Sequence, residues 1–231
     1  MTDITQKQPK SPAVKSTSFF ERSMWIFNTL FHQLVAVAGI FILWTLFYNY
    51  ENRLSRWHMI LTATAYLPLM AEAIVLFAGD NVWTQNIKRT TKYYIHGAFM
   101  FTSAVLATVG IGFMISVHSA PHFHSIHAWT GLVSWIFVLL SQFLGVASAK
   151  AYHLKSILRP VWFKFAHNLF GLLGYLFGLT SLCYGLRKRT FRENTTYESQ
   201  VATTVVIAVV GAWSIIAALR SGYNQLKNVI T

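Results

Sequence analysis

The chain has 231 residues, of which 54% are hydrophobic and only 11% are charged. A soluble domain carries about 25% charged residues, so this composition excludes an ordinary water-soluble protein and favours a polytopic membrane protein. The net charge of +12 does not indicate nucleic-acid binding, because the basic residues are scattered through the polar segments, where they serve as topology signals and lipid contacts. Cys183 is the only cysteine, which excludes an internal disulfide and cysteine pairs for zinc or iron–sulfur clusters.

Residues 1–22 are polar, and they predict a disordered cytosolic tail rather than a cleaved signal peptide. Six apolar runs follow, each long enough to cross a bilayer as a helix. They predict helices at residues 25–48, 58–77, 93–117, 127–149, 162–185 and 201–220. We therefore expect an all-α fold without internal repeats. A six-helix transmembrane bundle would span residues 23–222, its second to fifth helices would form a central four-helix core, and residues 223–231 would form a cytosolic tail.

The positions of lysine and arginine predict the orientation of these helices. Thirteen of the 19 lie in the N-terminal segment, the second and fourth connections and the C-terminal segment. The positive-inside rule therefore predicts that both termini are cytosolic, although the run Arg187-Lys188-Arg189 lies on the opposite side and counts against it. We favour the endoplasmic reticulum or another endomembrane over the plasma membrane, and a homodimer is compatible with the sequence.

Four histidines lie at the ends of four successive apolar helices: His58, His96, His127 and His167. A histidine in a membrane is costly to desolvate and usually has a partner or a function. Because successive helices are antiparallel, His58 and His127 lie near the outer face, and His96 and His167 near the inner face. Two imidazoles on either side of a porphyrin fill both axial sites and favour electron transfer. We therefore predict that each pair holds one haem iron, so that the second to fifth helices form a central four-helix di-haem core.

Glycines near the histidines support this prediction. Gly131 and Gly171 each follow a predicted ligand by four residues, on the same helix face, where a missing side chain would leave room for a haem. A single membrane histidine is more often a hydrogen-bonded packing residue, so the prediction depends on the set of four. His32, in the first helix, has no histidine partner at its depth and is interpreted as structural.

Around these residues the chain resembles the cytochrome b-561 family of transmembrane electron-transfer proteins. The resemblance covers about residues 25–220. In the family a proline commonly follows the first ligand, whereas this chain has Met59 there. The compact length and the stretch Leu69–Ala73 are most similar to the family's small branch of transmembrane reductases. The resemblance is carried by Arg56–Met59, by Lys88–Lys92 before His96-Gly97, by Ser125–Leu132, and by Phe165–His167 with the Gly171 and Gly174-Tyr175 that follow.

The resemblance implies a lipid-embedded oxidoreductase with two haem b groups. It would take electrons from cytosolic ascorbate and pass them to monodehydroascorbate or ferric iron on the other side. In the family, basic residues just before the third-helix histidine meet ascorbate. Arg89 and Lys92 are therefore the closest candidates, with Lys164 as a third, although the same residues also fit positive-inside topology alone.

On the outer side, the resemblance assigns substrate contact to His118 and His122. With His124 they form a histidine-rich loop before His127, and a merely solvated polar loop is the alternative. Glu72, about four turns after His58, is either a proton acceptor for the inner haem or a structural hydrogen-bonding residue, and the structural role is favoured.

Two other functions stay open. The chain could be a di-haem membrane anchor that passes electrons to a protein partner. It could also be a transporter or scaffold that uses its histidines for protons or packing; such a protein would be colourless, and the broken helices typical of transporters are not indicated.

Overall fold

A computed structural model describes residues 18–48, 53–79, 81–153, 155–156 and 159–230, and within these ranges the chain is helical and has no strands. Six spans are long and apolar enough to cross a membrane, as predicted. The second span is composite, because a π-helix (η1) joins two α-helices. The elements are α1 Phe19–Tyr48, α2 Leu54–Thr64, η1 Ala65–Met70, α3 Ala71–Val75, α4 Arg89–Val117, α5 Ile126–Ala149, α6 Pro160–Gly185, the short α7 Arg189–Arg192, and α8 Tyr197–Ile230.

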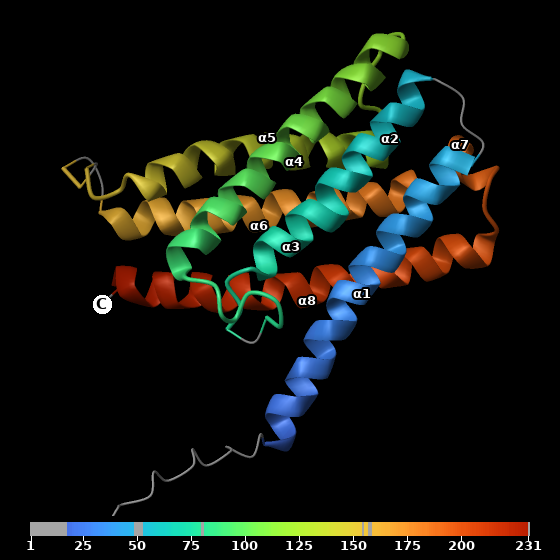
Figure 1. The fold of residues 1–231 in the computed structure, drawn as a ribbon. Coiled ribbons are helices and arrows are strands. Elements are labelled where there is room, and N and C mark those ends of the chain that lie inside the picture. Colours follow the sequence, from blue (N-terminus) through green and yellow to red (C-terminus); the bar gives the residue numbers. More distant parts are fainter. Residues whose placement is uncertain (1–17, 49–52, 80, 154, 157–158, 231) are drawn as a thin grey trace, which may run out of the picture.

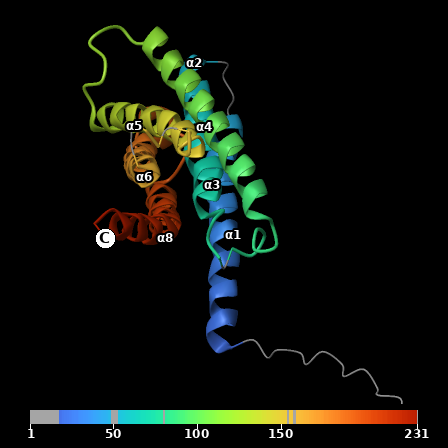
Figure 2. The ribbon, with the colours of Figure 1, turned by 90° about the vertical axis from the view of Figure 1, so that its left-hand side faces the viewer.

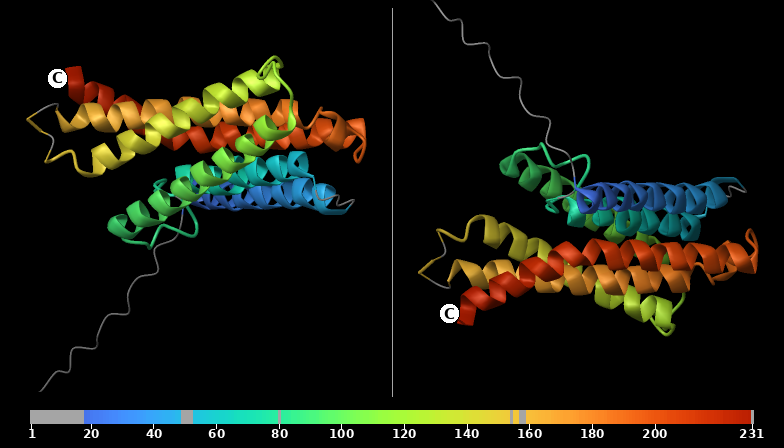
Figure 3. Two further views of the ribbon diagram at one scale, coloured as in Figure 1. Left: turned by 90° about the horizontal axis from the view of Figure 1, so that it is seen from above. Right: turned by 90° about the horizontal axis from the view of Figure 1, so that it is seen from below.

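The spans form two layers that cross each other (Figures 1 and 2). One layer contains α1, the composite span and α4; the other contains α5, α6 and α8. Views from above and below show the same division (Figure 3). We call the end where α1, α4 and α6 begin the Lys92 end, and the end where α2, α5 and α8 begin the His118 end. α1 starts and α8 finishes at the Lys92 end, as six antiparallel spans require.

Each of the six spans begins earlier than its apolar run predicts, and α8 also ends later. α1, α4, α5 and α6 end at the predicted residues, and the second span ends at Val75, two residues before the predicted end. α1 begins at Phe19 because Ser18 and Glu21 form a capping box: the Glu21 carboxylate accepts from the Ser18 main-chain N–H (2.8 Å), and the Ser18 hydroxyl accepts from the Glu21 N–H (3.2 Å). Residues 19–22 of the predicted tail are therefore helical, and residues 1–17 lie outside the described part of the chain. At the other terminus, α8 continues through residues 223–230 of the predicted C-terminal tail.

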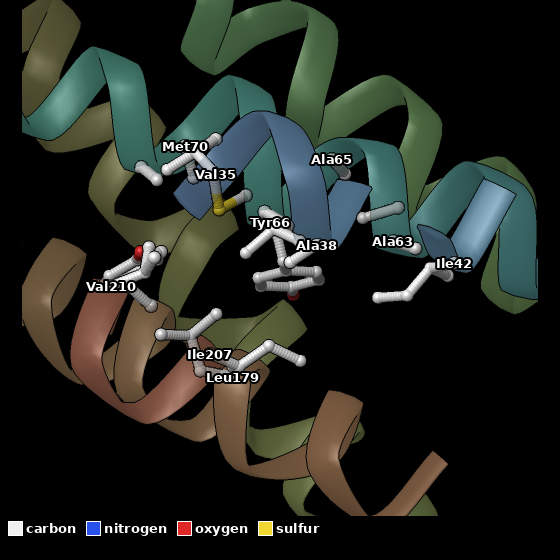
Figure 4. Packing of buried hydrophobic residues seen from close by; sticks show 14 of the residues in the cluster. Val35, Ala38, Ile42, Ala63, Ala65, Tyr66, Met70, Leu179, Ile207 and Val210 are labelled. Atoms are coloured by element: carbon white, nitrogen blue, oxygen red, sulfur yellow. The ribbon is translucent and has the colours of Figure 1, made fainter. Parts of the chain in front are cut away.

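Buried apolar side chains fill the contact between the two layers (Figure 4). Small residues of α1 and the composite span let the backbones approach closely, a common device in membrane bundles. Large hydrophobic side chains on the outside, such as Phe101 (67% exposed) and Phe143 (74% exposed), provide an apolar surface that suits contact with lipid. The labelled core residues are Val35, Ala38, Ile42, Ala63, Ala65, Tyr66, Met70, Leu179, Ile207 and Val210.

The π-helix lies in the middle of the composite span and contains Pro68. Proline has no main-chain N–H and would clash with the preceding turn of a regular α-helix, and a wider turn is one way to accommodate it. The wider turn inserts one extra residue between the two halves of the span. Tyr66, in this segment, points into the bundle, where its hydroxyl lies 2.7 Å from the Ser134 hydroxyl of α5.

Candidate functional site

The structure brings together the four predicted histidines in two pairs. The ring centroids of His58 and His127 are 6.0 Å apart, with planes inclined by 84°. Those of His96 and His167 are 6.1 Å apart, with planes inclined by 82°. Each pair joins the two layers, with one histidine from α2 or α4 and one from α5 or α6. The first pair lies toward the His118 end and the second toward the Lys92 end.

Every one of these imidazoles is oriented by a hydrogen bond from Nδ1 to a main-chain carbonyl. The acceptors are Gly110 for His58 (2.9 Å), Ala73 for His96 (3.0 Å), Ser181 for His127 (2.8 Å) and Ser141 for His167 (2.9 Å). A carbonyl can only accept, so Nδ1 carries the proton in all four rings. The Nε2 lone pair is therefore available for a metal, and the carbonyl fixes the tautomer and orientation of the ligand.

The acceptor positions follow one rule across the bundle. In the antiparallel pair α5 and α6, each histidine bonds the carbonyl 14 residues after the other histidine: Ser181 follows His167 by 14, and Ser141 follows His127 by 14. A helix rises about 1.5 Å per residue, so the two ligand levels lie about 21 Å apart along these helices.

The other antiparallel pair, α4 with the composite span, follows the rule with one change. Gly110 follows His96 by 14 residues, whereas Ala73 follows His58 by 15. The extra residue is the one that the π-helix inserts between the two halves of the composite span. Because the widened turn takes up this extra residue, the Ala73 carbonyl still faces His96.

α5 and α6 carry a repeat that our sequence analysis missed. His127, Gly131, Ser141 and Gly145 recur 40 residues later as His167, Gly171, Ser181 and Gly185. The prediction of no internal repeat is therefore wrong for these two helices. The pattern His-x3-Gly-x9-Ser-x3-Gly is visible in the sequence, but it occurs only twice. Its two copies lie on two antiparallel helices, so each end of one copy meets the opposite end of the other.

The repeat also revises the role given to two glycines. A Cβ atom at Gly131 would lie 3.0 Å from the Ser181 hydroxyl oxygen, and one at Gly171 would lie 3.0 Å from the Ser141 hydroxyl oxygen. These glycines therefore admit a serine of the facing helix, in place of the haem that we expected there. Gly145 and Gly185, at the other end of the repeat, admit the rings of His167 and His127.

The spacing of each pair fits an iron ion between the two rings. Metal–imidazole nitrogen bonds of about 2.0–2.1 Å place the centroids of two trans imidazoles about 6–6.5 Å apart, close to the observed 6.0 and 6.1 Å. Within the described residues, no group of three or more His, Cys, Asp or Glu side chains could hold a metal ion. Two ligands per site suit a metal whose remaining ligands come from a macrocycle.

The three basic residues predicted to contact the electron donor differ in how exposed their side chains are. Lys92 is only 9% exposed and lies in the first turn of α4, one turn before His96. Arg89 is exposed, and its guanidinium lies over the Tyr93 ring (5.7 Å to the centroid) and donates to the Tyr93 hydroxyl (2.9 Å). Lys164 is also exposed. Lys92 is thus the only one of the three that is turned into the bundle.

The three histidines of the loop before α5 do not form one cluster. His118, His122 and His124 are all exposed. His124 lines a hollow of about 310 Å³ together with Trp129 of α5, whereas His118 and His122 do not line it. His124 thus lies at the hollow beside the start of α5, whereas His118 lies within electrostatic reach of His58.

His32 and Glu72 form a pair that the sequence did not predict. His32 Nδ1 lies 2.8 Å from Glu72 Oε1, and the indole N–H of Trp83 donates to Glu72 Oε2 (3.3 Å). The partner of His32 in the structure is thus a carboxylate from another span.

Comparison with known proteins identifies relatives of this chain. It is 26% identical over 155 residues to the mouse transmembrane reductase CYB561D2, covering 63% of this chain and 66% of that protein, and 27% identical over the same extent to its human counterpart. It is 32% identical over 81 residues to the human probable transmembrane reductase CYB561D1, covering 34% of this chain and 35% of that protein. The matches to CYB561D2 thus cover slightly less than two thirds of the relative.

The model of the eukaryotic cytochrome b561 family matches residues 57–192, which is more than half of the chain. The matched range includes all four paired histidines and the helices that carry them. The chain belongs to the eukaryotic cytochrome b561 family.

Proposed function

We propose that the protein transfers electrons across a membrane through two haem b groups, one held by His58 and His127 and the other by His96 and His167. The observation that supports this most directly is the set of four Nδ1–carbonyl hydrogen bonds, which leave an Nε2 lone pair on each ring of two facing pairs. The family implies haem b, and the residues present fit it. Bound haem would supply reversible one-electron chemistry.

The protein's own contribution is to hold ligands at two depths. With ligand levels about 21 Å apart along α5 and α6, a single cofactor could not serve both membrane faces, whereas two in series can. The carbonyl acceptors belong to the backbones of packed helices, so the rings have little freedom to turn away from an iron. Such an arrangement suits electron transfer, which needs a coordination sphere that does not rearrange.

The electron donor in this proposal is an anion bound at the Lys92 end, with ascorbate as the leading candidate. The positive-inside rule places this end in the cytosol. Lys88, Arg89, Lys92, Lys150 and Lys164 lie near it, and a cluster of one sign of charge raises the local concentration of an anion. Lys92, which is turned inward one turn before His96, is the proposed direct contact.

The acceptor in this proposal meets the protein at the His118 end. Monodehydroascorbate and ferric iron are the two candidates that the family resemblance suggests. The hollow beside the start of α5, with His124 at its edge, is the proposed approach to the His58–His127 pair. His118 and His122 are exposed on the loop that leads to it and stay candidates for capturing the acceptor.

Haem content tests the proposal. The chain, produced with sufficient iron and porphyrin, should show a low-spin b-type spectrum and two haems per chain in a pyridine haemochrome assay. His167→Ala should lose one haem, and His127→Ala should lose the other. His153→Ala, in an exposed turn, is the matched control and should keep both. A pigment-free protein, or one whose haem content ignores these substitutions, would overturn the proposal.

The donor is tested separately in sealed vesicles that contain the purified protein. Ascorbate added on the Lys92 side should reduce the haems and, in turn, an acceptor on the other side. A protein that holds two haems but is not reduced by millimolar ascorbate would instead favour a membrane anchor that exchanges electrons with a partner protein.

A further inference from the structure

His32 and Glu72 form an acid–base pair inside the apolar part of the bundle. His32 lies in the middle of α1 and Glu72 in α3; their side chains are 19% and 18% exposed. Ionisable groups inside a membrane bundle are expensive to bury and tend to mark proton or ion sites. The pair takes no part in holding the four paired histidines, so its presence calls for a separate explanation.

The hydrogen bonds show which proton positions are occupied. The Trp83 indole can only donate, so Glu72 Oε2 is an acceptor. With Glu72 ionised, His32 Nδ1–H donates to Oε1, and the free lone pair is on Nε2. His32 Nε2 is buried and has no hydrogen-bond partner among the described residues. In this arrangement the pair carries one negative charge, and His32 Nε2 is a vacant proton position.

This pair is connected through the backbone to the histidine pair at the Lys92 end. Glu72 is followed by Ala73, whose carbonyl accepts the hydrogen bond from His96 Nδ1 (3.0 Å). On the other side of His96, the Phe77 ring lies 5.4 Å from the imidazole, centroid to centroid. Glu72 and the two residues that contact the His96 ring, Ala73 and Phe77, thus lie within six consecutive residues of α3 and the loop after it. The surroundings are apolar and screen charge weakly, so a charge at Glu72 should be felt at His96.

We infer that His32–Glu72 is a proton-binding site coupled to the electron occupancy of the His96–His167 site. The inference rests on the proposed electron-transfer function. When one electron arrives at that site from a one-electron donor, one proton from water at the Lys92 end binds His32 Nε2. The pair changes from histidine–carboxylate to imidazolium–carboxylate, and the charge of the region is unchanged. When the electron leaves, the proton is released.

The neighbouring elements contain few groups that could take this role instead. From α6, the fully buried Tyr175 faces the pair and is hydrogen-bonded to Ser214 of α8. From η1, Tyr66 bonds Ser134. α8 has no ionisable residue between Glu198 and Arg220, and α4 has only His96 between Tyr94 and His118. Lys92, Tyr93 and Tyr94 lie at the near end of α4. Arg56 of α2 and Arg53, which precedes this helix, lie at the far end of the bundle.

Among the groups that contact the pair, Trp83 is the most exposed, and it lies on the side of the Lys92 end. Trp83, which bonds Glu72, lies in the loop after α3 and is 41% exposed. The proton path is thus short on this side. The other histidine pair, at the His118 end, is separated from Glu72 by most of the composite span, so its coupling to the pair should be weaker.

A spectroelectrochemical titration of both haems between pH 5 and 9 tests the inference. In the wild-type protein, the midpoint potential of the His96–His167 haem should fall as pH rises. The reduction equilibrium constant should change by up to tenfold per pH unit, which is about 59 mV for one electron. In Glu72→Gln and in His32→Gln this slope should be lost while both haems stay bound. Glu193→Gln, which removes an exposed carboxylate paired with Arg189 at the other end, is the control and should keep the slope.

A second measurement covers the case in which a variant loses haem. Electrochemical reduction of the wild-type protein in weakly buffered solution with a pH indicator should consume up to about one proton per chain, on reduction of the His96–His167 haem. No proton uptake and a flat potential in the wild type would overturn the inference, as would an unchanged slope in both variants. A protein without haem would instead overturn the proposed function, so the two failures are distinct.

Discussion

His127 and Ser181 are joined by two hydrogen bonds that run in opposite directions between α5 and α6. The His127 Nδ1–H donates to the Ser181 carbonyl (2.8 Å), and the Ser181 hydroxyl donates to the His127 carbonyl (2.8 Å). His167 and Ser141 repeat the arrangement with distances of 2.9 and 3.1 Å. The side-chain N–H of the histidine and the side-chain O–H of the serine thus each bond the other residue's main chain. In both pairs the serine hydroxyl also lies 3.1 Å from the histidine Nδ1, but the carbonyl oxygen is the nearer acceptor for the ring N–H.

This division of roles predicts the effect of Ser181→Ala. Alanine retains the carbonyl that orients His127 and loses only the hydroxyl, so haem content should not change. The unfolding free energy should fall by about 0.5–1.5 kcal/mol, the usual contribution of one hydrogen bond. Thermal unfolding in detergent, followed by circular dichroism, measures it. Ser116→Ala, whose hydroxyl bonds its own helix at an exposed position, is the control and should change less. Loss of haem from the serine variant would show that the hydroxyl itself orients the ring.

The centre of the bundle predicts a sharp contrast between two glycines. A Cβ at Gly178 would collide with the Tyr66 ring and would lie 2.8 Å from the Ser134 hydroxyl oxygen, whereas a Cβ at Gly112 meets nothing within 4 Å. Gly178→Ala should therefore destabilise the protein by about 1–3 kcal/mol through overpacking. Gly112→Ala should be neutral or slightly stabilising, because alanine favours helix. Equal unfolding temperatures for the two variants would contradict the packing described between the layers.

The sequence predicts the spans and the histidine pairs because both depend on features that it contains. Apolar runs define six helices, and antiparallel order assigns His58 and His127 to one depth and His96 and His167 to the other. The predicted helix starts lie too late in the sequence because polar residues, such as the Ser18–Glu21 capping box, begin the helices before the apolar core, whereas most of the predicted ends are correct.

The missed features depend on how the helices are rotated against each other. Periodicity does not show which carbonyl faces an imidazole, so Gly131 was assigned to a haem when it faces Ser181. His32 and Glu72 are 40 residues apart on different spans, and only the packing of α1 against the composite span brings them together. Pro68 was the only local sign of the π-helix.

The position of Lys92 predicts that it contributes more to donor binding than the other basic residues. Lys92→Ala should raise the KM for ascorbate severalfold and leave the maximal rate less affected, because the lysine attracts an anion but ligates no metal. Arg89→Ala should have a smaller effect, since its guanidinium is exposed and occupied by Tyr93. Lys155→Ala is the control; this lysine lies over the Tyr152 ring, 4.6 Å from its centroid. Stopped-flow reduction at several salt concentrations measures the effects, and salt should weaken binding in the wild type most. Equal effects of Lys92→Ala and Lys155→Ala would indicate that both serve topology only.

The two glycines beside the histidine rings predict substitutions that act on one haem at a time. A Cβ at Gly145 would lie 3.1 Å from the His167 ring, and a Cβ at Gly185 would lie 3.3 Å from the His127 ring. Each ring would have to shift by a few tenths of an ångström against its carbonyl bond. Gly145→Ala should therefore change the electron paramagnetic resonance signal and the midpoint potential of the His96–His167 haem alone, and Gly185→Ala those of the His58–His127 haem alone. Gly112→Ala should change neither. If Gly145→Ala altered the two haems equally, the repeat would not hold the two sites independently, and the assignment of one ligand pair to each depth would have to be abandoned.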